Sequence, residues 1–435
     1  MLENRVSSKG IDSLLFAYIG FLFLNILEAY AIKGIPIPWI AMALIVVLAI
    51  IHRSLRGMPT VFGTSFFWLL FIWLGFVTFL NVVLGIHDIR MPSESTSSFG
   101  VFIALRFITL LSVVYTIRLV YHLCQKGYFH EIVRWTVLLG TVSAIFALYV
   151  YFAQMTGLPE PPRTRIGTGV QGQSTYFNFE IHRAMGSFRE PSLLAQWLIL
   201  PFFLSLMIGK KNINIHSALI GGALLLSGSF TGFIASATGI LASSILNITS
   251  PKQIASNLSK LLIPILLGLI LVTPFAVRHG DLGRQMMTDP FLVISALWSR
   301  ADKISQGDSE SSSRGYIFEY FQYEPVPPFG NGLGIASIIR SGDRITSWLN
   351  VYFNLLYSGG FIAVILLLLF LCYPLYLLGK GKIRSSPMLF FLLAGYCSWF
   401  FLYAAQSEEL NLFYGINYAL LIFMIQEAAA TRPGQ

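Results

Sequence analysis

Charged residues are scarce in this sequence: they make up 11% of 435 residues, while 55% are hydrophobic and the mean hydropathy is +0.70. Soluble domains carry about 25% charged residues. The scarcity therefore excludes a soluble multidomain enzyme and a disordered chain. It indicates a polytopic membrane protein, and at roughly 20 apolar residues per spanning helix the chain has room for about a dozen spans.

Cysteine is also rare, and the three cysteines, Cys124, Cys372 and Cys397, lie in or beside apolar runs. No Cys-x-x-Cys motif or Cys/His cluster is present, so we expect no zinc site, no disulfide framework and no cofactor. The polar N-terminus lacks a cleavable-signal pattern. The net charge of +9 reflects Lys and Arg in short cytoplasmic loops, so we expect no nucleic-acid partner.

The apolar runs predict an all-α polytopic membrane protein of about 12 transmembrane helices in a single integral membrane domain, residues 1–435. The predicted spans are 13–32, 36–51, 62–86, 99–123, 132–156, 191–208, 216–230, 232–247, 258–276, 347–378, 386–405 and 411–428.

The hydrophobic stretch 216–247 is too long for one span of a hydrocarbon core about 30 Å thick. Lysines at 210–211 and at 252 and 260 flank it on both sides. Because positive residues mark the cytoplasm, both ends lie inside and the stretch crosses twice. Residues 228–232, with two glycines and two hydroxyls, predict the bend.

The same rule orients the rest of the chain, with both termini in the cytoplasm and the loops 157–190 and 277–346 outside. The basic residues assigned to the cytoplasmic side are Arg5, Lys9, Arg53, Arg56, Lys126, Lys210, Lys211, Lys252, Lys260, Lys380, Lys382, Arg384 and Arg432.

Arginine dominates the two outside loops, where it outnumbers lysine ten to one. Arginine offers a planar fork that binds phosphate or carboxylate in a bidentate manner. The alternative is a purely structural role, in which these arginines pair with the acids of their own loops. A further arginine, Arg106, lies inside the fourth span, where a charge indicates function unless the side chain extends to the outer surface.

Three segments occur in a recognisable order: 183–197, 312–334 and 347–369. They resemble the superfamily of O-antigen ligases and O-antigen polymerases of bacterial envelope polysaccharide assembly. The first matches the family pattern R-x-x-G-x-F-x-x-P. The second resembles the family's arginine followed by a P-x-x-G-x-G-x-G turn, and the third resembles, without its histidine, the family's H-N-x-Y at the start of a span. The matching residues are Arg183, Gly186, Phe188, Pro191, Arg314, Pro328, Gly330, Gly332, Gly334, Asn350 and Tyr352, with the bend Ser229 to Gly232 in the place of a family turn.

The resemblance implies a GT-C-like bundle with a large helical periplasmic loop, 277–346, and a smaller one, 157–190. It implies a polymerase of the bacterial inner membrane whose active site faces the periplasm. That enzyme joins undecaprenyl-diphosphate-linked glycans, one as donor and one as acceptor, and releases undecaprenyl diphosphate. The lipid bilayer and a chain-length-regulating membrane protein are the other implied partners.

Arginines suit that chemistry because they neutralise the departing diphosphate without a metal ion. We therefore predict Arg183, Arg314, Glu190 and His279 as catalytic residues. The predicted substrate ligands are Arg106, Arg189, Arg278, Arg284, Glu319, Asn350 and Tyr352.

One departure separates the branches of the family. Ligases carry a histidine immediately before the Asn of N-x-Y, and here that residue is Leu349. The sequence thus favours a polymerase over a ligase that transfers glycan to lipid A-core. A glycolipid flippase or secondary transporter remains the alternative of another class, although transporters concentrate polar groups near the membrane midplane.

Overall fold

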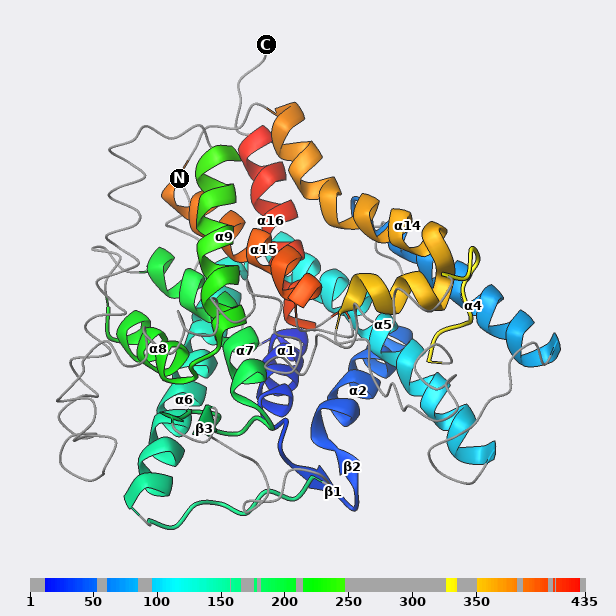
Figure 1. The fold of residues 1–435 in the computed structure, drawn as a ribbon. Helices are drawn as coiled ribbons and strands as arrows, with labels where there is room; N and C mark the ends of the chain where they lie inside the picture. The colour runs from blue at the N-terminus through cyan, green and yellow to red at the C-terminus, as the bar shows by residue number, and fades with distance from the viewer. Residues whose placement is uncertain are drawn as a thin grey trace, which may run out of the picture.

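The structure, a computed structural model, describes residues 12–52, 61–84, 96–156, 158–165, 176–177, 181–208, 214–246, 326–334, 350–381, 386–405, 410 and 412–430. Most of these residues are helical (Figure 1). The helices are α1 (Ser13–Asn25), α2 (Ile37–Ile51), α4 (Thr64–Leu84), α5 (Thr96–Gln125), α6 (Phe129–Thr156), α7 (Pro191–Ile208), α8 (Ile215–Leu226), α9 (Phe230–Leu246), α14 (Val351–Gly381), α15 (Pro387–Ala405) and α16 (Leu412–Ala430).

The chain is a helical polytopic membrane protein, as the composition predicts. Seven helices, α4, α5, α6, α7, α14, α15 and α16, are long and apolar enough to cross a membrane, and α1, α2, α8 and α9 are shorter apolar helices. Each of these helices falls on one of the predicted spans, whereas the predicted span 258–276 lies outside the described residues. The count of twelve therefore stays a prediction.

Two short strand pairs accompany the helices. The predicted span 13–32 is too long, because α1 ends at Asn25 and the chain then forms a hairpin of β1 (Ala31–Ile32) and β2 (Ile35–Pro36). Its two-residue turn, Lys33 and Gly34, has φ of 51° and 84°, the positive values of a type I′ hairpin turn. A second short pair joins β3 (Tyr176–Phe177) to β4 (Ile181–His182).

The predicted bend in the stretch 216–247 is confirmed, three residues wide and slightly earlier than expected. Helix α8 ends at Leu226, α9 begins at Phe230, and Gly228 between them has a φ of 54°. Left-handed φ is inexpensive only for glycine, so Gly228 is the residue that lets the chain turn. The Ser229 hydroxyl accepts from the Gly232 amide at 3.2 Å and supports the first turn of α9.

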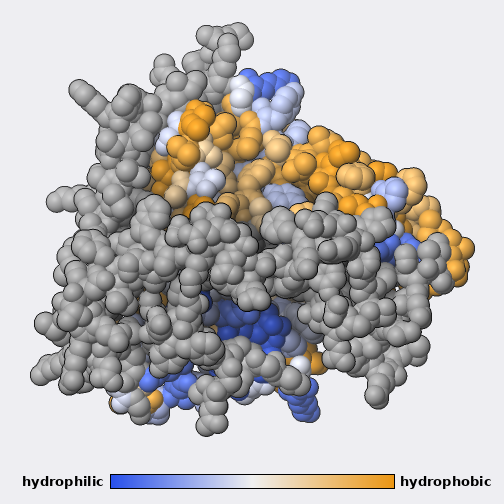
Figure 2. Space-filling model, viewed as in Figure 1, coloured by the Kyte–Doolittle hydropathy of each residue, from blue (hydrophilic) through white to orange (hydrophobic). Residues whose placement is uncertain are grey.

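Two helices present an apolar surface. Helices α4 and α14 pack side by side (Figure 1). Figure 2 shows hydrophobic residues over the part of the surface where α14 runs. The exposed apolar side chains of these helices include Leu69, Ile72, Phe76, Phe79, Val83, Phe361, Ile365, Leu368 and Leu369. A surface this apolar on a soluble protein would be unusual, and it suits contact with lipid.

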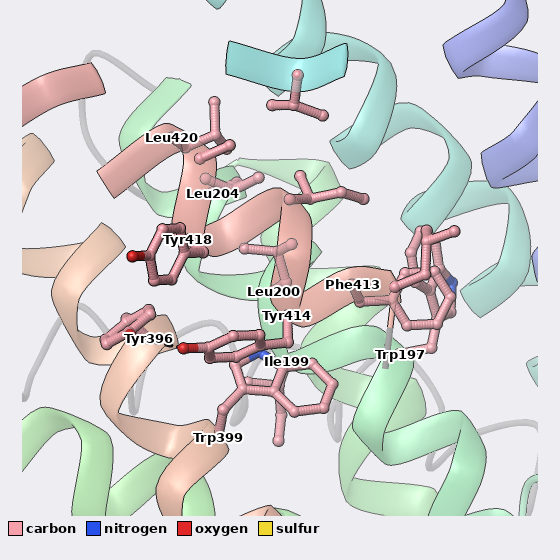
Figure 3. Close-up of a cluster of buried hydrophobic side chains, with 14 of the residues drawn as sticks. Trp197, Ile199, Leu200, Leu204, Tyr396, Trp399, Phe413, Tyr414, Tyr418 and Leu420 are labelled. Carbon is pink, nitrogen blue, oxygen red and sulfur yellow. Dashed lines mark hydrogen bonds between the residues drawn. The ribbon is translucent and has the colours of Figure 1, made fainter. Parts of the chain in front are cut away.

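The core of the bundle is aromatic where α7, α15 and α16 meet (Figure 3), and Phe370 of α14 packs against Tyr414 and Tyr418. Tyr396 donates its hydroxyl to the Leu371 carbonyl at 2.7 Å, so its contact with the Tyr414 hydroxyl, also 2.7 Å, has Tyr414 as donor. Tyr418 donates to the Phe62 carbonyl at 2.8 Å. Buried hydroxyls with partners add specificity to packing that is otherwise only hydrophobic.

Candidate functional site

The segment 183–190, which carries two of the predicted arginines, owes its shape to its apolar residues. Gly186 has a φ of 55°, and a Cβ there would lie 2.9 Å from the backbone of Ala147 on α6. Phe188 is buried, and Pro191 begins α7, a first-turn position that suits proline. The R-x-x-G-x-F-x-x-P pattern thus anchors a tight loop between α6 and α7 and fixes where its two arginines emerge.

Arg183 lies at the bend between α8 and α9. Its Nε donates to the Ser227 carbonyl at 2.8 Å, and the adjacent Ala184 amide donates to the Leu226 carbonyl at the same distance. A Cβ on Gly228 would lie 3.4 Å from Arg183 Nε. The structure therefore joins two features that are 44 residues apart and that the sequence predicted separately.

Arg189 is bound by Glu28, a residue that the sequence did not predict as part of the site. Glu28 Oε1 accepts from Arg165 Nη1 and from Arg189 Nε, and its Oε2 accepts from the Arg189 amide at 2.8 Å. Arg165 Nη1 also donates to the Glu28 carbonyl at 3.1 Å. One carboxylate thus binds two guanidiniums and one backbone amide.

Backbone contacts hold the same three segments together. The Ala29 amide donates to the Ser187 carbonyl at 2.8 Å, and the Ser187 hydroxyl donates to the Ile26 carbonyl at 2.5 Å. On the other side, the Arg165 amide donates to the Ala29 carbonyl at 3.2 Å, and Thr164 Oγ1 bridges the Ala31 amide and carbonyl at 2.8 Å and 3.0 Å. We call this assembly of residues 26–31, 163–165 and 187–189 the Glu28 junction.

The junction is partly desolvated. The side chains of Glu28 and Arg165 are each 14% exposed, whereas that of Arg189 is 39% exposed. Burial raises the pKa of the Glu28 carboxyl, and the two guanidiniums, Arg189 more than Arg165, act against that rise. Burial likewise lowers the pKa of Arg165, and Glu28 opposes that shift. The guanidinium of Arg165 also lies over the Trp39 ring, with Cζ 5.9 Å from the centroid.

Arg189 differs from Arg165 in having an outer edge. The Glu28 carboxylate accepts from the Nε and the main-chain amide of Arg189. The two terminal nitrogens of the Arg189 guanidinium make no hydrogen bond within the described part of the chain. Next to it, Glu190 is exposed and its Oε2 accepts from the Ser192 hydroxyl at 3.0 Å. A guanidinium held by its inner edge and open at its outer edge is suited to bind an oxyanion.

Arg163 is bound differently from its neighbour Arg165. Its Nη1 contacts Met185 Sδ at 3.3 Å and its Nη2 donates to the Gly186 carbonyl at 3.4 Å. Burial lowers the pKa of this guanidinium, and the nearby Glu160 opposes the shift. Glu160 in turn accepts from Gln154 Nε2 at 2.9 Å. Arg163 therefore supports the loop around Gly186 from inside the protein.

The glycine turn of the second matching segment packs against a break in α14. At Gly360 the backbone has a φ of 67° and a ψ of −165°, which interrupts the helix. The carbonyls released by the break are taken up by other groups: Tyr357 O by the Asn331 amide at 2.8 Å, Ser358 O by the Gly332 amide at 2.8 Å, and Gly359 O by Trp73 Nε1 at 2.7 Å. The turn thus completes the broken helix.

Asn350 and Tyr352 are bound to helix ends. Asn350 Oδ1 accepts from the Tyr352 amide at 2.9 Å and the Phe353 amide at 3.2 Å, and its Nδ2 donates to the Ala404 carbonyl. Tyr352 donates its hydroxyl to the Phe400 carbonyl at 3.3 Å. The N-x-Y motif therefore caps α14 and attaches it to α15.

Of the remaining predicted site residues, only Arg106 lies in the described part of the chain. Arg106 lies half-buried on α5, near the start of the apolar part of that helix. The other predicted site residues, Arg278, His279, Arg284, Arg314 and Glu319, lie outside the described residues. Within the described part of the chain, no three His, Cys, Asp or Glu side chains gather closely enough to hold a metal ion.

Comparison with known proteins gives no match to a protein family, to a curated protein or to a solved structure. The family resemblance therefore depends on the motifs described above.

Proposed function

We propose that the protein is a polysaccharide polymerase of the bacterial inner membrane, with its active site facing the periplasm. It joins undecaprenyl-diphosphate-linked repeat units and releases undecaprenyl diphosphate. In the reaction, a hydroxyl of the acceptor glycan attacks the anomeric carbon of the donor, a glycosidic bond forms, and the bond from that carbon to the diphosphate oxygen breaks. The hydroxyl proton passes to a base, for which Glu190 and His279 are the candidates.

The observation that carries this proposal is the arrangement of Arg183 and Arg189 on one short segment at the start of α7. Arg183 Nε is held by the bend at Ser227. Arg189 is held by Glu28, and no described residue bonds the terminal nitrogens of its guanidinium. Preorganised donors of this kind stabilise charge that develops on a leaving group. A diphosphate carries that charge, and its polyprenyl tail requires an enzyme embedded in the bilayer.

A transporter or flippase is the second candidate, because broken helices such as α14 are typical of transporter substrate sites. In those sites the released backbone groups bind substrate or ions. Here the carbonyls at residues 357–359 are bound by the glycine turn and by Trp73. That occupancy favours the enzyme, with the break serving as a docking point for the glycine turn 330–334.

The deciding experiment supplies purified protein in sealed proteoliposomes with undecaprenyl-diphosphate-linked repeat units, with and without lipid A-core, and no nucleotide sugar. A ladder of polymers supports the proposal. Transfer only onto lipid A-core indicates a ligase, and movement across the membrane without a covalent product indicates a flippase. Either of these outcomes refutes the polymerase.

Arginine variants connect the activity to the site. Loss of one charge-directed donor costs on the order of 10²–10³ in rate, and lysine cannot replace a bidentate fork. We expect Arg183→Lys and Arg183→Ala to fail almost equally while reaching normal abundance. Arg134→Ala, at an exposed position of α6, is the matched control and should form normal ladders. Normal ladders from well-expressed Arg183→Ala would remove this residue from the site.

A further inference from the structure

Glu28 belongs to a part of the chain that the family resemblance does not reach. It follows α1, in a connection of residues 26–36 between two short apolar helices. Yet its carboxylate makes three hydrogen bonds to residues that lie more than 130 positions further along the chain. A buried carboxylate with so many distant partners is costly to desolvate and is kept only if the partners compensate it.

The geometry at Arg189 shows what the carboxylate fixes. Oε1 holds the guanidinium through Nε, and Oε2 holds the amide of the same residue at 2.8 Å. Side chain and main chain are thereby clamped by one group, so the plane of the guanidinium has a defined direction. Because the Nε edge is used, the edge formed by the two terminal nitrogens is the one that remains for a ligand.

Arg165 completes the clamp from the opposite side. It pairs with Oε1 and with the Glu28 carbonyl, and its guanidinium lies over Trp39. This second cation offsets the negative charge of Glu28. The net charge of the three groups is therefore positive by one, and the positive charge that is exposed to solvent is that of Arg189.

We propose that Glu28 is a positioning residue that orients the outer edge of Arg189 toward the diphosphate of the lipid-linked substrate, an assignment that rests on the proposed function. Glu28 does not touch the substrate. It acts through Arg189, and the two guanidiniums neutralise its own negative charge. Glutamine cannot reproduce this role, because its Nε2 is a donor and would face either the Arg189 amide or the guanidiniums.

The opposite possibility is that Glu28 occupies the place of the ligand and must leave before a diphosphate can bind. The two possibilities differ in sign. A positioning carboxylate makes anion binding stronger, so its removal weakens binding. A carboxylate that blocks the site makes binding weaker, so its removal strengthens binding through the two arginines whose charge it no longer offsets. The backbone ties at Ala29, Ala31 and Ser187 favour positioning, since they hold Glu28 in place independently of any ligand.

The test measures binding rather than turnover, with farnesyl diphosphate as the probe and farnesyl monophosphate as the comparison, by calorimetry on the full chain in detergent. We expect Glu28→Gln to bind the diphosphate about 10- to 100-fold more weakly, as for the loss of a charge-assisted hydrogen-bonded pair. Glu28→Asp keeps the charge but is shorter by one methylene, and we expect it to fold and to bind with intermediate affinity.

Two controls separate positioning from a structural effect. Thr136→Val removes the buried hydrogen bond between Thr136 and the Tyr18 hydroxyl, outside the junction, and we expect a lower melting temperature with affinity within twofold of the wild type. The second control uses Arg189→Lys, which keeps a positive charge beside Glu28 but lacks the planar guanidinium. Adding Glu28→Gln to this variant should not change its affinity further, because the two residues act as one unit.

Several outcomes overturn the inference. Unchanged or tighter binding by Glu28→Gln or Glu28→Asp excludes positioning, and tighter binding supports the blocking carboxylate. If Glu28→Gln does not fold, wild-type affinity in Glu28→Asp is sufficient to reject the role. Absence of diphosphate binding by the wild type removes the proposed function together with this inference, whereas wild-type binding with no effect of Glu28 removes the inference alone.

Discussion

The contact between the glycine turn and the break in α14 makes a sharp prediction about stability. A Cβ on Gly330 would lie 2.4 Å from Gly359 N and from the Ser358 carbonyl carbon, and Gly330 has a φ of 88°. These are backbone atoms, which cannot rotate away as a side chain can. The change Gly330→Ala therefore forces the turn away from the helix.

The expected cost has two parts. A non-glycine residue with left-handed φ loses about 1–2 kcal/mol. Separation of the turn also breaks the bonds from Asn331 N to Tyr357 O, from Gly332 N to Ser358 O and from Leu333 N to Thr78 Oγ1, all 2.8 Å, at about 1 kcal/mol each. We expect Gly330→Ala to lower the free energy of unfolding by about 4–5 kcal/mol.

The measurement is reversible unfolding in mixed detergent micelles, followed by helical circular dichroism. Gly379→Ala is the control, because Gly379 lies on α14, the helix that the turn contacts, and has nothing within 4 Å of its added Cβ. We expect this control to be neutral or to gain about 0.5–1 kcal/mol from helix propensity. The reasoning fails if Gly330→Ala and Gly379→Ala are equally stable.

Three further predictions concern other parts of the chain. Gly228→Ala should lose about 1–2 kcal/mol because its φ is positive, whereas Gly20→Ala, which has open space on α1, should not; equal melting temperatures would contradict the role of Gly228 at the bend. Asp12→Ala should cost about 1 kcal/mol through loss of the cap on the Leu14 amide, while Asp12→Asn keeps the cap and loses only the ion pair with Lys126. Burial raises the pKa of Asp12, but the Leu14 amide and Lys126 together outweigh burial, so the pKa is lowered. The ion pair should therefore stabilise the protein above about pH 4 and cease to do so as the pH falls through the lowered pKa. A cysteine at Ser174, with the three native cysteines replaced, should react with a membrane-impermeant maleimide in cells with permeabilised outer membranes; protection until lysis would reverse the orientation.

Hydropathy predicted the helices well, because lipid imposes the same requirement on every span. A backbone without water must satisfy its own hydrogen bonds, so a long run of apolar residues predicts a helix of similar length. The stretch 216–247 shows how charge adds to this: flanking lysines predicted two helices rather than one, and the structure has α8 and α9 with Gly228 between them. That both helices cross the membrane stays a prediction. Where the prediction was wrong, at the end of span 13–32, a short hairpin competes with helix, and Lys33-Gly34 is its only local signal.

Motif reasoning found Arg189 at the Glu28 junction, and Arg183 close to it in sequence, but not the carboxylate that binds Arg189. Arg183 and Arg189 stood out because a short pattern surrounds them, while Glu28 sits alone after an apolar run and has no pattern of its own. Nothing local distinguishes a glutamate that binds water from one that binds two distant guanidiniums. A weak signal existed nonetheless, since Glu28 is an acid within the predicted span 13–32, and a charge placed there is expensive unless it has a function.

The motifs also proved to combine two kinds of residue. Gly186, Phe188, Gly330, Gly332 and Asn350 are explained by close backbone approach, burial or helix capping. Such residues would be required in any protein of this shape, whatever its chemistry. The function proposed here therefore depends on the residues that shape alone does not explain, above all the outer edge of Arg189, because no partner within the described chain uses those nitrogens while its inner edge is clamped by Glu28.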